Sequence, residues 1–156
     1  MISLIAIASD HGGLHLKEAV KELLKEREIP FEDCGTEDGE SVDYPDYGEK
    51  VARKVAAGAV EKGILFCGTG IGMSIVANKF PHVRAALVTD TFMARMAKEH
   101  NNANILVLGG RIIDENQARD MVATWLDSKY EGGRHQGRLD KIALIEREIF
   151  HTGSTE

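Results

Sequence analysis

The sequence contains few cysteines, and it has no apolar run long enough to span a membrane. Only Cys34 and Cys67 occur in 156 residues, too few for a disulfide framework of the kind that holds small secreted proteins together. The apolar stretch Ile2–Ala8 is shorter than a membrane span, and no basic segment precedes it. We therefore expect no signal peptide, no membrane helix and a cytoplasmic location.

An excess of positive charge is also missing. The formal net charge is −6 at pH 7, so a basic face for a nucleic acid is not expected. No Cys/His cluster has the spacing of a zinc site, so neither a metal nor another cofactor is expected. The hydrophobic share of 43% is that of an ordinary folded domain. We predict one domain over residues 1–150, followed by a loose tail at residues 151–156.

Short stretches rich in Ile, Val and Leu recur along the chain. Each has apolar side chains on both faces, as do strands that are covered on both sides in a parallel sheet. The predicted strands are Ile2–Ala8, Ile29–Asp33, Gly63–Cys67, Arg84–Val88 and Asn104–Leu108.

Amphipathic stretches with helical spacing separate these strands. The predicted helices are Gly13–Glu28, Asp46–Val60, Ile71–Lys79, Thr91–Glu99, Glu115–Leu126 and Gln136–Phe150. Such alternation predicts an α/β fold, a single-domain three-layer α/β/α sandwich with a doubly wound, Rossmann-like, five-stranded parallel sheet and a C-terminal helix. Ligands bind such folds at the carboxyl ends of the strands.

The segment Ser9–Gly13 follows the first predicted strand and contains two ionisable groups before a pair of glycines. Asp10 and His11 are therefore well placed to meet a ligand. The alternative is that Asp10 caps the following helix and His11 is an ordinary loop residue. These five residues alone leave both interpretations open.

A glycine-rich loop, Cys67–Ser74, follows the third predicted strand. Its alternating glycines let the backbone approach a ligand and direct N–H groups at an anion. The loop lacks the lysine of a P-loop and misses the dinucleotide fingerprint by one residue, although Asp90 lies where the ribose-binding acid would be. A non-catalytic nucleotide-binding module and tight strand–helix packing are therefore the alternatives to a catalytic loop.

Cys67 stands at the entrance to this loop, just before a predicted helix. A helix N-terminus favours the thiolate form of a cysteine over the thiol, which makes it a stronger nucleophile and base. The alternative is a small buried hydrophobic residue at the end of a strand. We assign that structural role to Cys34, because no reactive residue type surrounds it in the sequence.

Further polar residues flank the last strand and helix. His100–Asn104 lead into the fifth strand, and Arg111 follows it. Arg134 and Arg138 are four residues apart at a helix start, where they could bind a phosphate together. A solvated helix start is the alternative, but positive charge there opposes the helix dipole, which favours a functional role.

Together these segments resemble the type B ribose-5-phosphate isomerases, within a wider family that includes galactose- and allose-phosphate isomerases. The resemblance covers about residues 2–148 and keeps the family's order. The matching elements are Ser9-Asp10-His11-Gly12-Gly13, Asp43-Tyr44-Pro45, Cys67-Gly68-Thr69-Gly70-Ile71-Gly72, Ala77-Asn78-Lys79, His100-Asn101 with Asn104, and Tyr130-Glu131-Gly132-Gly133-Arg134-His135 with Arg138.

The resemblance implies an aldose–ketose isomerase of the pentose phosphate pathway, which interconverts ribose 5-phosphate and ribulose 5-phosphate through an enediolate. In it, Cys67 resembles the base that moves a proton between C1 and C2. His100, helped by Asp10, resembles the group that opens the furanose ring. The other implied roles are oxyanion stabilisation by Thr69 and the backbone of Gly68, Gly70 and Gly72, phosphate binding by His11, Arg111, Arg134 and Arg138, and hydroxyl binding by Tyr44 and Asn101.

The resemblance leaves the substrate between a pentose and a hexose phosphate, with allose 6-phosphate and galactose 6-phosphate as alternatives. Cys67, His100 and the two C-terminal arginines on one chain favour the ribose 5-phosphate enzyme. Ser74 lies where some members have a glutamate base, which places this chain with the cysteine-base group. We expect a homodimer in which Arg134 and Arg138 reach the neighbour's phosphate while His100 and Cys67 act in their own chain; pairing into tetramers is left open.

Overall fold

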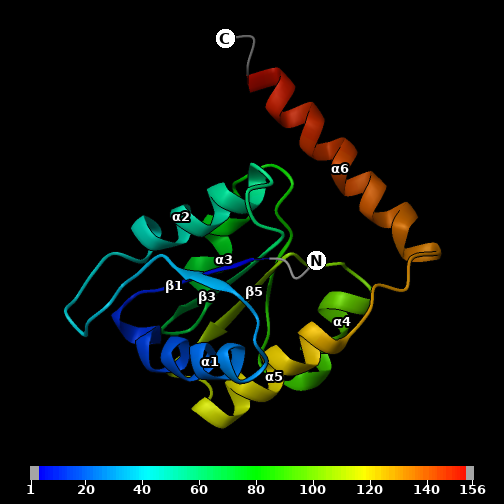
Figure 1. Cartoon of the computed structure of the whole chain (residues 1–156). Coiled ribbons are helices and arrows are strands. Elements are labelled where there is room, and N and C mark those ends of the chain that lie inside the picture. Colours follow the sequence, from blue (N-terminus) through cyan, green and yellow to red (C-terminus); the bar gives the residue numbers. More distant parts are fainter. Residues whose placement is uncertain (1–3, 154–156) are drawn as a thin grey trace.

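Five parallel strands form a sheet in the order β2-β1-β3-β5-β4 (Figure 1). The computed structural model describes residues 4–153. The strands are β1 (Ile5–Ser9), β2 (Phe31–Asp33), β3 (Lys62–Cys67), β4 (Ala85–Leu87) and β5 (Ile105–Gly109). The chain adds β2 on one side of β1 and then continues on the other side with β3, so the sheet is doubly wound. The predicted fold class is confirmed.

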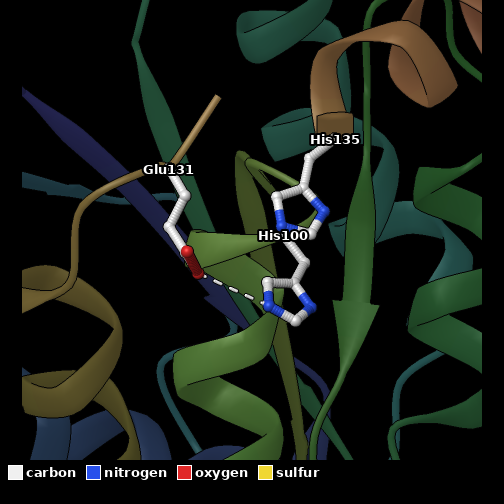
Figure 2. Close-up of side chains that lie close together, drawn as sticks. All are labelled: His100, Glu131 and His135. Atoms are coloured by element: carbon white, nitrogen blue, oxygen red, sulfur yellow. Dashed lines mark ion pairs between the residues drawn. The ribbon is translucent and has the colours of Figure 1, made fainter. Parts of the chain in front are cut away.

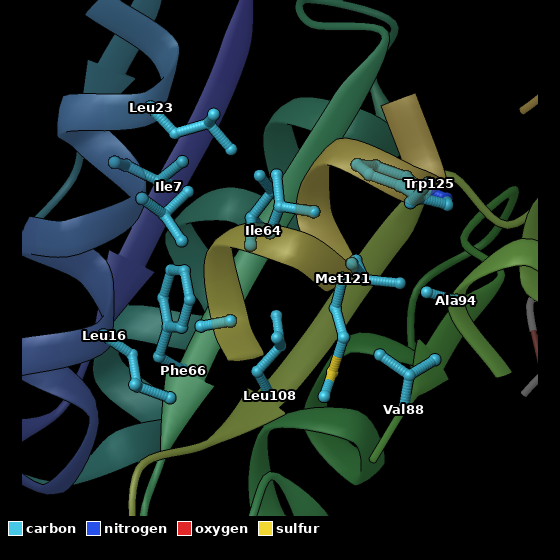
Figure 3. Packing of buried hydrophobic residues seen from close by; sticks show 14 of the residues in the cluster. Ile7, Leu16, Leu23, Ile64, Phe66, Val88, Ala94, Leu108, Met121 and Trp125 are labelled. Carbon is cyan, nitrogen blue, oxygen red and sulfur yellow. The ribbon is translucent and has the colours of Figure 1, made fainter. Parts of the chain in front are cut away.

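The helices are α1 (Leu14–Glu26), α2 (Tyr44–Ala56), α3 (Ile71–Ala77), α4 (Thr91–Glu99), α5 (Glu115–Asp127) and α6 (Arg134–Gly153), together with a 3-10 turn, η1 (His11–Gly13). Apolar residues of α1, α4 and α5 form the core on one face of the sheet (Figure 3). Residues of α2 and α3 form the core on the other face. Two layers of helix therefore cover the sheet, and α6 belongs to neither.

Both faces of the central strands are buried because their side chains alternate between the two cores. In β1, Ile5 and Ile7 pack against α1, whereas Ala6 and Ala8 pack on the side of α2 and α3. The small alanines on that side leave room for helices to lie close to the sheet. This two-sided burial explains why the strands have continuous apolar runs instead of alternating polar residues.

Several boundaries differ from the predicted ones. The first strand begins at Ile5, and Ile2 lies outside the described residues. The predicted helix Gly13–Glu28 is divided into η1 and α1, because Asp10 accepts a hydrogen bond from the Gly13 N–H and tightens the first turn. Strands β2 and β4 are three residues each, which suits short strands at the edges of a sheet.

Helices α2 and α6 also begin earlier than predicted. Helix α2 starts at Tyr44, with Pro45 in its first turn, where a missing N–H costs nothing. It ends at Ala56, and the positive φ of Gly58 (75°) turns the chain away. Helix α6 runs to Gly153, so residues 151–153, which were expected in the tail, are helical; residues 154–156 lie outside the described residues.

Helix α6 extends away from the rest of the molecule (Figure 1). One tie to the body is the hydrogen bond from the His82 N–H to the Glu146 carboxylate, 3.0 Å long. Several apolar side chains of this helix are exposed: Ile142, Leu144, Ile145, Ile149 and Phe150. Among residues 4–153, no helix combines the length and the apolar character needed to cross a membrane.

Candidate active site

The carboxyl ends of β1, β3 and β5 lie side by side and hold three of the predicted site segments together. Cys67 pairs in register with Gly109, and Ser9 pairs with Phe66. Beyond the strands, the Asp10 N–H donates to the Phe66 carbonyl at 3.1 Å, and the Arg111 N–H donates to Gly68 at 2.8 Å. Continued backbone pairing thus brings Asp10, the glycine loop and Arg111 to one edge of the sheet.

The glycine loop is tight because its neighbours occupy the space that side chains would need. Gly70 has a φ of 84°, and a Cβ there would lie 2.4 Å from Cδ1 of Leu87. A Cβ at Gly72 would lie 2.5 Å from Cε2 of Tyr44, so the phenol ring rests against the loop. Tyr44 is partly exposed and reaches this loop from the first turn of α2.

Cys67 is 4% exposed and belongs to the apolar core on the α2 and α3 side. Its carbonyl accepts a 2.8 Å hydrogen bond from Gly110, which fixes the strand end. Two residues on, the Thr69 hydroxyl accepts from the Ile71 N–H at 3.3 Å. Since that hydroxyl serves as the acceptor, its own proton is free to be donated to a bound oxyanion.

Asp10 and His11 take the local roles that were the alternatives to ligand binding, but each keeps capacity for a ligand. Asp10 is 7% exposed, and its Oδ1 caps η1 through the Gly13 N–H at 3.1 Å. Nδ1 of His11 accepts from the Val42 N–H at 3.2 Å. That hydrogen bond selects the tautomer with its proton on Nε2, where it can be donated to an anion.

The Arg111 side chain lies over the glycine loop. A Cβ at Gly68 would lie 3.5 Å from Cδ, Nε and Cζ of Arg111. The Arg111 side chain would thus be in ordinary van der Waals contact with a Cβ at Gly68. This arrangement places a fixed positive charge beside the glycine loop at Gly68.

A second group of predicted residues lies around His100, which caps the C-terminus of α4. The His135 ring stacks on the His100 ring with centroids 4.2 Å apart and planes inclined by 18° (Figure 2). Nε2 of His100 lies 3.5 Å from Oε1 of Glu131. Arg134 begins α6 next to His135, and Arg138 follows one turn later.

The His100 group lies at the opposite edge of the sheet from Cys67. His100 precedes β5, whereas Cys67 is level with Gly109, the last residue of β5. At roughly 3.3 Å per residue, the ends of that strand are about 13 Å apart. The expectation that His100 and Cys67 act together within their own chain was therefore wrong, because the helix-to-strand connection that carries His100 lies at the amino edge.

Other predicted residues have structural partners. Asn104 accepts from the Arg84 N–H at 2.8 Å and donates to the His82 carbonyl at 2.7 Å, so it braces the turn before β4. Asn101 lines a cavity of about 250 Å³ beneath α6. Asp90 caps α4 by accepting from the Met93 N–H at 2.7 Å. Because the Asp90 carboxylate serves as this cap, it is not available to bind a ribose, which argues against the nucleotide-binding alternative.

Sequence reasoning assigned no role to Glu131 or His135, although both lie in the C-terminal motif. Their contact with His100 joins positions about thirty residues apart, and no local spacing reveals it. Within residues 4–153, His100, Glu131 and His135 are a set that could ligate a metal ion, with one ligand atom each and all three atoms within 4.8 Å of one another.

Comparisons with known proteins agree with this fold. The family model described as Ribose/Galactose Isomerase matches residues 5–142. The chain is 43% identical to ribose-5-phosphate isomerase B of Escherichia coli over 92% of this chain and 96% of the relative. The structure of Clostridium thermocellum ribose-5-phosphate isomerase B has a TM-score of 0.91 and 51% identity, covering 94% of this chain and 99% of that one.

A further structure, ribose-5-phosphate isomerase B from Mycoplasma genitalium, contains bound ribulose 5-phosphate. Its TM-score is 0.91 at 42% identity, over 95% of this chain and 99% of that chain. Fold and sequence together define the class of the protein, an α/β sugar isomerase. The chain belongs to the Ribose/Galactose Isomerase family.

Proposed function

We propose that this chain interconverts ribose 5-phosphate and ribulose 5-phosphate, as an aldose–ketose isomerase of the pentose phosphate pathway. The observation that carries the proposal is Cys67 at the entrance to a glycine loop, with Thr69 and Arg111 beside it at the carboxyl edge of the sheet. The Mycoplasma relative, with its bound ribulose 5-phosphate, supports the choice of a pentose phosphate.

Cys67 is the base in the proposed reaction. Its thiolate takes the proton from C2 of the open-chain aldose, and the resulting thiol returns a proton to C1. A proton also passes from the C2 hydroxyl to the C1 oxygen, so the product is the isomeric ketose. A proton next to a carbonyl is weakly acidic, so the reaction needs a positioned base and a stabilised oxyanion together.

The glycine loop stabilises that oxyanion. The Thr69 hydroxyl and the N–H groups of Gly68, Gly70 and Gly72 form its proposed donors. A Cβ at Gly70 or Gly72 would collide with Leu87 or Tyr44, so glycine at both positions lets the loop keep this tight conformation. Each such donor contributes roughly 10²–10³ in rate when it points at the developing charge.

Substrate binding involves the residues around the loop. His11 donates from Nε2 to the phosphate, Arg111 adds a fixed guanidinium, and Arg134 and Arg138 complete the anion site. Tyr44 and Asn101 bind sugar hydroxyls. His100, with Asp10, opens the furanose ring by moving a proton between the hydroxyl and the ring oxygen, a task that suits an imidazole near neutral pH.

These roles require two chains, and we infer a two-fold homodimer with shared sites. Cys67 and Asp10 lie at the carboxyl edge of the sheet, whereas His100 lies about 13 Å away at the amino edge by strand length. A second chain related by a two-fold axis can bring its own His100, Arg134 and Arg138 to Cys67. The symmetry then generates two equal sites.

Exposed apolar surface supports this dimer. Helix α6 displays Ile145 and Ile149, and its outward direction leaves them without cover from their own chain. Near the glycine loop, Ile71, Ile75 and Phe92 are also exposed. Exposed apolar side chains grouped on a surface are typical of surfaces that associate, and we infer that α6 of one subunit covers those near the partner's loop.

A cytoplasmic location fits the proposed chemistry. Cys34 and Cys67 are both free, and the base must remain a reduced thiol to work. Reducing conditions of that kind are those of the cytoplasm.

The test is a side-by-side assay of the purified protein with ribose 5-phosphate and allose 6-phosphate. We expect kcat/KM to be at least about tenfold higher for the pentose, since a site shaped for five carbons gains no contact from a sixth. A Cys67→Ser protein, purified in parallel, measures any contaminating host isomerase. A preference for allose 6-phosphate, or no activity above that background, would overturn the proposal.

A further inference from the structure

The three residues of the His100 group are held together by a built loop. The Glu131 N–H donates to the Glu99 carbonyl at 3.0 Å, which places residue 131 beside the end of α4. Gly132 and Gly133 have φ values of 64° and 54°, and this left-handed pair returns the chain toward His100. The His135 N–H closes the turn on the Gly132 carbonyl at 3.0 Å.

The donor atoms of this group are those that bind zinc. Two imidazoles and a carboxylate form a known three-ligand zinc set, in which a water molecule completes the tetrahedron. With ligands about 2.1 Å from the metal, tetrahedral geometry puts the donor atoms about 3.4 Å apart. Nε2 of His100 and Oε1 of Glu131 are already 3.5 Å apart, and all three donors lie within 4.8 Å.

Only a modest rearrangement is needed to bring the two rings to one ion. The rings are nearly parallel, at 18°, so their lone pairs do not yet converge (Figure 2). Rotation about the soft χ2 torsion of one histidine corrects this. Glu131 is half exposed, so its carboxylate can follow the ion, and His100 is 37% exposed, which leaves the ion a way in.

Charged neighbours of the group act on a cation in opposite directions. The charges of Arg134 and Arg138 oppose a cation, while the Glu131 carboxylate attracts it.

We propose that His100, Glu131 and His135 of a single chain form a binding site for Zn²⁺ or a similar borderline divalent ion. Occupancy of this site takes the lone pair of His100, so it withdraws that residue from proton transfer. The ion is therefore an inhibitor. The binding site stands independently of the proposed isomerase activity; only its inhibitory effect rests on that function.

The thiols must be excluded from the test, because Cys34 and Cys67 also bind zinc. Binding is therefore measured by titration calorimetry with ZnCl₂ on full-length protein carrying Cys34→Ser and Cys67→Ser. We expect one ion per chain. Glu131→Gln and His135→Gln, each added to this background, should weaken binding by at least about tenfold, the smallest loss seen when even an outer-shell partner of a metal ligand is removed.

His82→Asn is the matched control, because it removes an imidazole outside the group at a positive φ that asparagine tolerates. It should leave the affinity unchanged. Because Glu131 is exposed, Glu131→Gln tests the site even if His135→Gln fails to fold. No binding to the serine background, or equal affinity with and without Glu131→Gln, would overturn the site.

A second measurement tests the inhibitory effect on the wild-type enzyme with both thiols present. ZnCl₂ should inhibit isomerisation, and EDTA should restore full activity. In the Glu131→Gln enzyme, the zinc concentration for half inhibition should rise by at least about tenfold. Equal inhibition of both enzymes would assign the effect to the thiols and overturn this part of the proposal, while the calorimetry still decides the site.

Discussion

Cys67 ends strand β3 and Cys34 follows strand β2, but their surroundings distinguish a reactive thiol from a structural one. Cys67 opens the glycine loop, with Thr69 and Arg111 close by. For Cys34, burial and the neighbouring Glu32 carboxylate raise the pKa of the thiol, so it stays protonated at neutral pH. Of the two cysteines, only Cys67 is therefore proposed as the base.

Replacing Cys67 by serine should abolish turnover and leave substrate binding intact. The hydroxyl keeps the shape of the thiol, but its pKa is far too high for a base at neutral pH, so kcat should fall at least about 100-fold. Steady-state kinetics measures kcat, and a binding titration with ribose 5-phosphate measures affinity. Cys34→Ser is the control and should keep kcat. A serine variant with more than about a tenth of the wild-type kcat would contradict the assignment.

At the residue scale, the sequence predicted which residues have local structural or site roles better than it predicted which residues they contact. The cap at Asp10 and the pair of arginines at the start of α6 follow from local spacing, because helix starts have local rules. The contact of His100 with Glu131 does not, because it joins the end of α4 to the loop before α6, which is distant in sequence. Proximity of that kind depends on chain turns that no short pattern encodes.

At the scale of elements, a buried ion pair joins α1 to β2. Lys17 is fully buried and donates to Oδ1 of Asp33 at 2.7 Å and to the Thr36 carbonyl. Lys21 donates to the other carboxylate oxygen at 2.9 Å. Burial alone would raise the pKa of Asp33, but the hydrogen bonds from Lys17 and Lys21 outweigh it and lower that pKa. The pair therefore contributes to stability in a pH-dependent way.

Asp33→Asn should destabilise the fold by about 3 kcal/mol at pH 7, because it leaves the buried Lys17 ammonium without its counter-charge. A depressed folded-state pKa gives stability that is present above the unfolded value of about 3.9 and is lost as pH falls through the folded value. The difference in unfolding free energy between wild type and variant should therefore shrink below about pH 4. Urea unfolding at a series of pH values measures it.

The control for Asp33→Asn is Glu22→Gln, which breaks an exposed pair with Lys25. Its free energy of unfolding should change by less than about 1 kcal/mol at every pH. If Asp33→Asn lowers the free energy of unfolding by the same amount at every pH, packing and not charge is responsible for the destabilisation.

The turn between β3 and α3 is a second element-scale constraint. Gly70→Ala places a side chain at a φ of 84° and against Leu87, so we expect the free energy of unfolding to fall by about 2 kcal/mol. The Tm measured by thermal unfolding should then fall by about 4–8 °C. Gly39→Ala is the control, since a Cβ there meets nothing within 4 Å. Equal Tm values for Gly70→Ala and wild type would show that the turn relaxes without strain.

At the scale of the whole molecule, the layered fold could be predicted because strand burial and helix periodicity repeat along the chain. Each strand of the parallel sheet is covered on both faces, and that requirement leaves apolar runs which sequence reasoning can detect. The distribution of site residues over the two edges was missed. His100 precedes a strand and Arg111 follows it, so the sheet separates residues that lie only eleven positions apart.

This separation determines which inactive variants should complement each other. In a shared-site dimer, Cys67 of one chain works with His100, Arg134 and Arg138 of the other. Refolding Cys67→Ser together with the double variant Arg134→Ala, Arg138→Ala should therefore recover about a quarter of wild-type activity. Random pairing makes half of the dimers mixed, and each mixed dimer has one intact site.

His100→Ala refolded with the same arginine variant should stay inactive, because His100 and the arginines reach a site from the same chain and every mixed site then carries one defect. Mixed dimers are verified by native mass spectrometry of chains with different tags, so a lack of activity cannot be due to failed pairing. Recovery in both pairings would place His100 with Cys67 of its own chain, against the distance across β5. No recovery in either pairing would assign the arginines to their own chain, and the shared site would be rejected.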